Sequence, residues 1–213
     1  MSITSKARNL LLHPLKSTRK VIDLIKYKRR FIEYHWSCRV SPSRQIRSDK
    51  PCLKLGKMCY IGPGARIQGV FRYNDKCFTP LITMEEGVSI QQNIHLTCAS
   101  RVTIGANTAI GANVTITDIN HPYEDVTLPI EAADITTADV MIGKDCKIYN
   151  NAVILPGVTI GRHCVVGANS VVNRSLPDYC VAVGAPARIV KRYDASLGKW
   201  LPTDENGAFI TKK

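Results

Sequence analysis

Residues 142–174 read IGKDCKIYNNAVILPGVTIGRHCVVGANSVVNR, and they contain the most regular pattern in the chain. An aliphatic residue occupies every sixth position in it: Ile142, Ile148, Ile154, Ile160, Val166 and Val172. A period of six fits neither the 3.6-residue period of an α-helix nor the two-residue alternation of a paired strand. It is typical of a parallel β-solenoid, in which each coil buries its apolar side chains against the coils above and below.

The same period recurs in three earlier stretches of the chain. Their aliphatic positions are Leu55, Ile61 and Ile67, then Ile82, Val88 and Ile94, and then Ile104, Ile110 and Ile116. Three hexads make one triangular coil, so these hexads predict an all-β fold of about five coils. An ordinary β-sandwich with glycine-rich turns is the alternative, but a sandwich does not keep a period of six in phase over such a length.

Other positions of the hexad have their own chemistry. The residue after the aliphatic one is often glycine, and the third residue after it belongs to the types that tolerate positive φ. We therefore predict a left-handed corner at these third positions: Gly64, Asn107, Asn113, Asp145, Asn151, Gly157, His163 and Asn169. The fourth residue after the aliphatic one is small or medium-sized, as expected for a filler of the interior.

The chain has eight cysteines. Four of them fall on the fourth position of the hexad, where they act as compact apolar fillers: Cys59, Cys98, Cys146 and Cys164. There is no C-x2-C pair of the kind that binds zinc. A reducing cytoplasm is the simplest environment for such a chain.

The net charge of +12 is concentrated near the N-terminus. Residues 1–50 carry thirteen Lys/Arg and three Asp/Glu, whereas residues 51–213 carry sixteen and fourteen. Residues 1–36 are predicted to form a basic amphipathic helix with a break at Pro14. Such an arm can cover the end of the solenoid or a neighbouring subunit, or lie on an anionic membrane or glycan. Nucleic acid is the least favoured partner. Neither a signal peptide nor a membrane-spanning stretch is apparent, which favours a cytoplasmic protein with at most peripheral contact with the inner membrane.

The predicted organisation has three parts. Residues 1–50 form the basic helical arm and a connector, residues 51–181 form the β-helix, and residues 182–213 form an extended C-terminal segment and tail. The β-helix is interrupted by an inserted loop at 117–141. Loops of this length in compact proteins are usually functional.

A histidine lies near the start of the inserted loop. His121 could serve as a general base near neutral pH, or it could be an ordinary loop residue bonded to backbone. His95 follows a predicted core position and could line the same cleft, while His163 occupies a predicted corner. No Ser-His-Asp spacing, phosphate-binding loop or dinucleotide-binding motif is present, so nucleotide hydrolysis and hydride transfer have no support.

Four segments carry a resemblance to a known family. They are NIHLTCASRVTIG (93–105), TDINHP (117–122), ILPGVTIG (154–161) and VGAPARIV (183–190). Over roughly residues 55–192 the chain resembles the hexapeptide-repeat acyltransferases, among them the galactoside, maltose and Nod-factor O-acetyltransferases and the polysaccharide O-acetyltransferases. The resemblance implies a left-handed parallel β-helix, a homotrimer with sites between adjacent subunits, acetyl-CoA as the acetyl donor, and no metal.

The resemblance also assigns roles to individual residues. His121 matches the catalytic histidine of the family, and Asn93 matches an asparagine near the reacting groups. The positions that match contacts to acetyl-CoA are Asn150, Ala168, Asn173, Arg174 and Arg188. The family often has lysine at the position of Arg174, and either cation can meet a phosphate.

The function expected from these features is direct transfer of an acetyl group to a sugar hydroxyl, in the biosynthesis of a cell-surface polysaccharide such as capsule, O-antigen or exopolysaccharide. A soluble sugar, an amino sugar or a streptogramin-type antibiotic is an alternative acceptor. A zinc enzyme related to the γ-type carbonic anhydrases would need three grouped histidines, and only His95 and His121 are suitably placed. A non-catalytic β-helix that serves as a binding scaffold is the remaining alternative.

Overall fold

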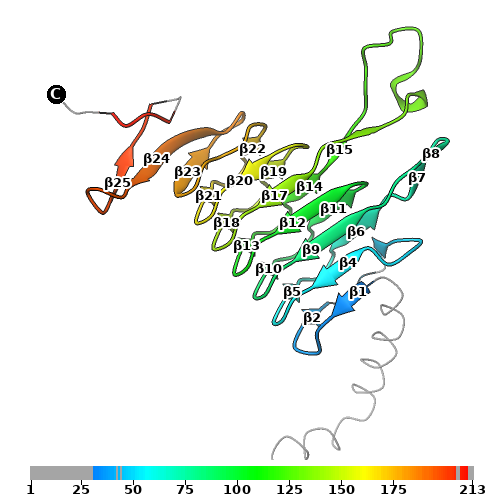
Figure 1. Ribbon diagram of the computed structural model, residues 1–213, viewed down its shortest axis with the longest axis horizontal. Helices are drawn as coiled ribbons and strands as arrows, with labels where there is room; N and C mark the ends of the chain where they lie inside the picture. The colour runs from blue at the N-terminus through cyan, green and yellow to red at the C-terminus, as the bar shows by residue number, and fades with distance from the viewer. Residues whose placement is uncertain (1–30, 42, 44, 205–206, 211–213) are drawn as a thin grey trace, which may run out of the picture.

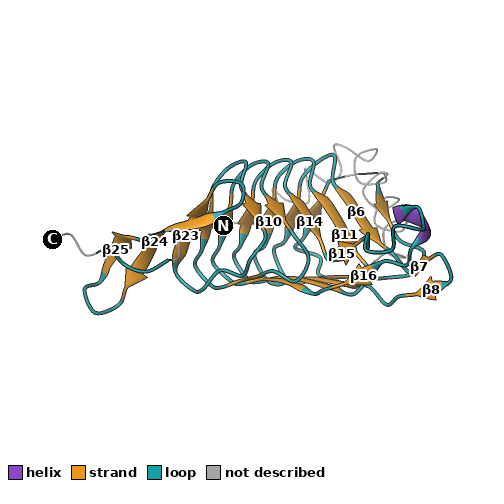
Figure 2. Ribbon diagram, turned by 90° about the horizontal axis from the view of Figure 1, so that it is seen from above, coloured by secondary structure: helices purple, strands orange, loops and turns teal. Residues whose placement is uncertain are grey.

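A parallel β-helix forms the body of the protein in the computed structural model (Figure 1), which describes residues 31–41, 43, 45–204 and 207–210. The predicted all-β, left-handed parallel β-helix is confirmed. Strands from successive coils pair in parallel to give three sheets, and Figure 2 shows the coils stacked along the long axis.

Each sheet contains one strand from each coil. The first sheet consists of β1 (Phe31–Tyr34), β4 (Leu53–Leu55), β9 (Leu81–Met84), β12 (Arg101–Ile104), β17 (Val140–Ile142) and β20 (Thr159–Ile160). The second begins with β2 (Arg39–Val40), β5 (Tyr60–Ile61), β10 (Ser89–Ile90), β13 (Ala109–Ile110), β18 (Lys147–Ile148), β21 (Val165–Val166) and β23 (Cys180–Val183). The third consists of β3 (Ile46–Arg47), β6 (Arg66–Gly69), β11 (His95–Cys98), β14 (Thr115–Thr117), β19 (Val153–Ile154) and β22 (Val171–Val172).

The first coil begins earlier than predicted. Strands β1, β2 and β3 pair in parallel with β4, β5 and β6, so residues 31–47 form a complete coil before the predicted start at residue 51. The five coils predicted for residues 55–172 are present, and the coil at residues 31–47 is an additional one that precedes them. Phe31 is buried in the core, and an ion pair of 3.2 Å joins Glu33 to Lys54 on the next coil. The predicted helix over 1–36 is therefore wrong at its C-terminal end, and residues 1–30 of it lie outside the described residues.

The predicted phase of the repeat is wrong in one coil. Met84 pairs with Leu55 and Ile104, so the repeat there runs through Met84, Ile90 and Leu96. The predicted set of Ile82, Val88 and Ile94 is also buried, but it occupies other inward-facing positions. Both sets are apolar because alternate residues of a strand face the same way, and hydrophobicity alone does not choose between them.

The predicted corners are confirmed. Every non-glycine residue predicted there has φ between 53° and 60°, and Gly64 and Gly157 have φ of 70° and 77°. Along the edge between the second and third sheets the corner side chains form an amide ladder. Asn93 donates to Asn113, Asn113 donates to Asn151, and Asn151 donates to Asn169, at 3.1, 3.0 and 2.9 Å.

The interior cysteines are fillers, as predicted. Cys59, Cys98, Cys146 and Cys164 are buried and free of disulfides. Burial raises the pKa of the Cys59 thiol to about 11, which keeps it protonated at neutral pH. Cys98 lies on β11 at the edge between the third and first sheets rather than at the predicted fourth position, because the phase of that coil differs.

Three segments leave the stack of coils. A hairpin of β7 (Arg72–Tyr73) and β8 (Lys76–Cys77) follows β6. The predicted long loop follows β14 and contains β15 (Ile119–Asn120), the 3-10 helix η1 (Ile130–Ala132) and β16 (Thr136–Thr137). At the C-terminal end, β24 (Arg188–Asp194) and β25 (Lys199–Pro202) extend the second sheet with antiparallel pairing.

Replacing Gly105 with alanine is expected to destabilise the fold. A Cβ at Gly105 would lie 2.5 Å from the backbone nitrogen of Lys144 on the next coil, and backbone cannot yield as a side chain can. We expect Gly105→Ala to lower the free energy of unfolding by about 2–4 kcal/mol, measured by denaturant titration. The control is Asn107→Gly in the same coil, which keeps a residue suited to positive φ and should cost no more than about 1 kcal/mol. Equal losses for the two variants would contradict the close-approach explanation.

Candidate active site

A buried carboxylate holds the start of the long loop against the β-helix. The Asp118 side chain is fully buried, and its two oxygens accept hydrogen bonds from the backbone N–H groups of Ala99 and Ser100 at 2.8 and 2.7 Å. The Cys98 thiol donates to the same carboxylate at 3.3 Å. The turn between β11 and β12 therefore fixes the point at which the chain leaves the coil, three residues before His121.

The end of the loop is tied to the same turn. The Asp139 carboxylate accepts a hydrogen bond of 2.7 Å from the Ser100 hydroxyl and lies 3.8 Å from the Arg101 guanidinium. Between the two ends, β15 and β16 form an antiparallel ribbon in which Asn120 pairs with Thr136. His121 therefore lies just beyond the base of the loop, where both ends are anchored and the two strands are paired.

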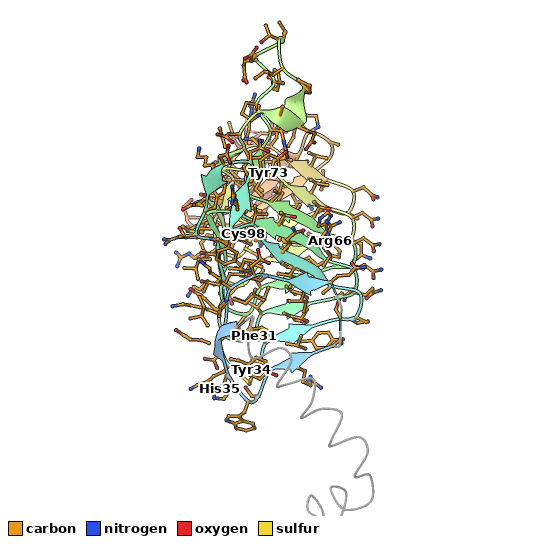
Figure 3. The ribbon with its side chains drawn as sticks, turned by 90° about the vertical axis from the view of Figure 1, so that its right-hand side faces the viewer. Phe31, Tyr34, His35, Arg66, Tyr73 and Cys98 are labelled. Carbon is orange, nitrogen blue, oxygen red and sulfur yellow. The ribbon has the colours of Figure 1, made fainter. Side chains whose placement is uncertain are left out.

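His121 is exposed and has an aromatic neighbour. The edge of one ring meets the face of the other where His121 contacts Tyr73, with centroids 5.5 Å apart and planes at 79°. Figure 3 labels Tyr73 below the projecting loop. The structure places His121 on the predicted inserted loop and adds its neighbour Tyr73. Tyr73 was not predicted, because residues 71–81 showed only an interruption of the repeat.

The hairpin β7–β8 is bonded to the far part of the loop. The Tyr73 hydroxyl donates to the Glu131 carboxylate at 2.8 Å and lies 3.1 Å from the Glu131 carbonyl oxygen. The Asn74 amide donates to the carbonyl oxygens of Ala132 and Ala133 at 3.2 and 3.4 Å. The hydrogen bond to Glu131 raises the pKa of the Tyr73 phenol, so the phenol remains a donor at neutral pH. Tyr73 and Asn74 thus tie the hairpin to the loop that carries His121.

Asn93 lies at a different edge of the prism from His121. It occupies a left-handed corner between β10 and β11, with φ of 59°, and its amide begins the ladder described above. The loop that carries His121 departs after β14, at the edge between the third and first sheets. Within one chain the structure does not bring Asn93 and His121 together, and the misplaced phase of this coil is why the corner position of Asn93 was not foreseen.

The five residues predicted to contact acetyl-CoA border the third sheet near the C-terminal end of the prism. Asn150 and Ala168 follow β18 and β21 on successive coils, at the edge between the second and third sheets. Asn150 is also a structural residue, because its side-chain oxygen accepts a 3.0 Å hydrogen bond from the backbone of Ala112. Arg188 lies beside β22, since the adjacent Ala187 donates its backbone N–H to Val171 at 2.8 Å.

Asn173 and Arg174 lie at the opposite edge of the third sheet. They follow β22, whose Val172 is in register with Ile154 and Ile116 on the two preceding coils. Arg174 therefore stands in the column of Asp118, two coils further along, and is exposed. The predicted donor-binding residues are thus divided between two edges of one face.

His95 projects outward from the third sheet. Its pKa is lowered by burial and by the neighbouring Arg66 guanidinium, and its Nε2 lies 3.4 Å from the Thr97 hydroxyl oxygen. Across the described residues, no group of three or more His, Cys, Asp or Glu side chains is arranged to hold a metal ion.

Comparisons with known proteins identify the family. The model for "Bacterial transferase hexapeptide (six repeats)" matches residues 139–174, and that for "Hexapeptide repeat of succinyl-transferase" matches residues 101–119. A relative from Escherichia coli K12, named as a lipopolysaccharide biosynthesis O-acetyl transferase (WbbJ), is 35% identical over an alignment of 162 residues that covers 73% of this chain and 79% of the relative. The chain belongs to the hexapeptide-repeat O-acetyltransferases.

Other members of the family match over shorter spans. The galactoside O-acetyltransferase of E. coli K12 is 35% identical over 107 residues, 49% of this chain and 52% of that protein. The crystal structure of a maltose O-acetyltransferase from Clostridium difficile 630 has a TM-score of 0.53 and 29% identity, covering 65% of this chain and 68% of that chain. This hexapeptide-repeat protein is therefore an enzyme of the acetyltransferase class, for which acetyl-CoA is the acetyl donor. In the part of the chain that the structure describes, no helix has the length and hydropathy to cross a bilayer.

Removing the Asp118 carboxylate is expected to release the loop base. Asp118→Ala leaves the backbone N–H groups of Ala99 and Ser100 without their acceptor, so we expect a loss of about 2–4 kcal/mol in the free energy of unfolding. Hydrogen exchange at Ala99 and Ser100 should increase as well. Asp139→Asn is the control, because that side chain is exposed and should cost less than about 1 kcal/mol. Unchanged protection of these two amides in Asp118→Ala would contradict the anchoring role.

Proposed function

We propose that this hexapeptide-repeat acetyltransferase transfers the acetyl group of acetyl-CoA directly to a sugar hydroxyl, with His121 as the general base. The imidazole of His121 takes the proton of the acceptor hydroxyl while the oxygen attacks the thioester carbonyl. The tetrahedral intermediate then expels the coenzyme A thiolate, which is protonated on release, and no covalent enzyme intermediate is required. The observation that carries this proposal is an exposed imidazole held just beyond a doubly anchored loop base.

The arrangement of the third sheet supports a path for the donor. Arg174 and Asp118 belong to one column of the prism, two coils apart, which corresponds to about 10 Å at the strand spacing of a sheet. We propose that the pantetheine arm runs along this edge, with its thioester toward His121 and its phosphates toward Arg174. Asn173 would lie beside the arm, and Arg188 would contribute a second cation.

The acceptor is proposed to be a hydroxyl of a cell-surface polysaccharide precursor. The relative named for lipopolysaccharide biosynthesis supports a polysaccharide, and those named for galactoside and maltose support a sugar hydroxyl. Residues 117–141 contain six Asp/Glu and no Lys/Arg. Such a loop repels anionic groups, so the sugar ring next to His121 should be uncharged.

A homotrimer with shared sites is part of the proposal. The projecting loop exposes apolar side chains that gain nothing from water: Tyr123, Val126, Leu128 and Ile130 are 71, 91, 49 and 52% exposed. Burial against a neighbouring subunit would remove this surface from solvent. In a cyclic trimer, Asn93, Asn150 and Ala168 of one subunit would complete the site that His121 of the next subunit begins.

Peripheral contact between the basic arm and the inner membrane or an anionic glycan remains a prediction. Most of the arm, residues 1–30, lies outside the described residues.

Replacing His121 should abolish the chemical step without affecting the donor site. We expect His121→Asn to reduce kcat by about 10²–10⁴-fold, the usual contribution of a general base. Turnover is measured as coenzyme A thiol released from acetyl-CoA with oligosaccharide acceptors, and donor binding as the thermal shift produced by coenzyme A. The control is His163→Asn, which keeps a residue suited to the left-handed corner and should retain turnover. Normal turnover by His121→Asn would rule out this mechanism.

Mixing two inactive variants tests whether the site is shared. Asn93→Gly keeps the corner conformation and, under the proposal, lowers turnover, as His121→Asn does. When the two chains are co-expressed at equal levels, about a quarter of the interfaces would combine an intact Asn93 with an intact His121. Turnover well above that of either variant alone is the expected result. No recovery, with mixed oligomers verified by mass, would place both residues in the same subunit's site or remove Asn93 from the site.

A further inference from the structure

The hairpin β7–β8 and the long loop leave the β-helix at the same edge. Strand β6 precedes the hairpin and β14 precedes the loop, and both belong to the third sheet, two coils apart. Figure 1 and Figure 2 show the two excursions side by side. Their contacts converge on a single side chain, since Tyr73 touches His121 near the start of the loop and Glu131 near its far end.

We propose that Tyr73 is a positioning residue that holds the imidazole of His121 in its reactive orientation. The proposal rests on the proposed function, because it concerns the orientation of the general base. The ring of Tyr73 restricts rotation of the His121 ring, and its hydroxyl ties this ring contact to the loop through Glu131. A general base works only within hydrogen-bond reach of the proton it removes, so a freely rotating imidazole would spend most of its time out of reach.

The rest of the hairpin is arranged to keep Tyr73 in place. Asn74, at the turn, has φ of 50° and donates its amide to two carbonyl oxygens of the loop. On the outer side of the hairpin, Arg72 pairs with Asp75 at 3.2 Å, and both side chains are exposed. His121, by contrast, is exposed and lies beyond the anchored base, so its side chain depends on this neighbour for its orientation.

A merely structural role for Tyr73 would show as a lower melting temperature in its variants, whereas a positioning role would show as lower turnover. Tyr73 belongs neither to the buried core of the β-helix nor to the partly buried hydrophobic side chains packed against that core. Its removal should therefore alter turnover while leaving the melting temperature of the protein nearly unchanged. It should also leave the donor site intact, because the proposed donor residues lie on later coils.

The test compares two substitutions of Tyr73 with a control in the same hairpin. We expect Tyr73→Leu to lower kcat by about 10- to 100-fold, with the KM for acetyl-CoA within about twofold of the wild type. Tyr73→Phe keeps the ring against His121 and should stay within about threefold of wild-type kcat. Asp75→Asn, which removes only an exposed ion pair, should leave kcat within about twofold. Wild-type kcat in Tyr73→Leu, or an equal loss in Tyr73→Phe, would overturn the proposal.

A second measurement separates this proposal from the proposed function. Because Tyr73 acts through His121, adding Tyr73→Leu to His121→Asn should lower the residual turnover no further, whereas a further loss of the full factor would overturn the positioning role. The ring of Tyr73 should also shift the His121 ring-proton resonances in NMR spectra of histidine-labelled protein, and Tyr73→Leu should remove that shift. An unmoved resonance overturns the contact itself. Full activity of His121→Asn alone overturns the proposed function instead.

Discussion

Backbone hydrogen bonds between successive coils set the spacing of the β-helix, and the other features of the fold conform to that spacing. Backbone N–H and C=O groups of successive coils pair in parallel along three sheets, which holds neighbouring coils about 4.8 Å apart. At this distance a Cβ at Gly105 or Gly143 would collide with the backbone of the next coil. The same spacing brings the corner amides within hydrogen-bond distance, so the ladder from Asn93 to Asn169 follows from the stacking.

Because the coils are so uniform, chemistry depends on the segments that leave them. A coil offers short strands whose outward side chains are spread along flat sheets, whereas the hairpin and the long loop bring an aromatic ring, a carboxylate and an imidazole close together. Both leave from one edge, and coils two apart are close enough for the segments to touch. Asp118 and Asp139 tie both ends of the loop to the turn between β11 and β12.

The residues proposed for the site are divided between two edges of the prism, which is why the proposal uses two subunits. Asn93, Asn150 and Ala168 lie on one side of the third sheet, and Asn173, Arg174 and the loop lie on the other. A ligand held between two prisms can touch both sets, one from each subunit. The exposed apolar side chains of the loop provide a reason for the prisms to associate. The proposed shared site thus follows from this division and from the apolar side chains that the projecting loop exposes.

The repeat, the corners, the inserted loop at 117–141 and the family could all be read from the amino-acid sequence, because each depends on residue types at a fixed spacing. The place of His121 after a break in the repeat made it a candidate, and the family resemblance assigned it the role of general base. Only the tertiary structure decided the first coil at 31–47, the phase at Met84 and the meeting of Tyr73 with His121 and Glu131. The phase was ambiguous because two sets of residues in that coil face inward. The contact of Tyr73 joins residues 48 and 58 positions apart, and the stacking of coils, rather than any local pattern, brings them together.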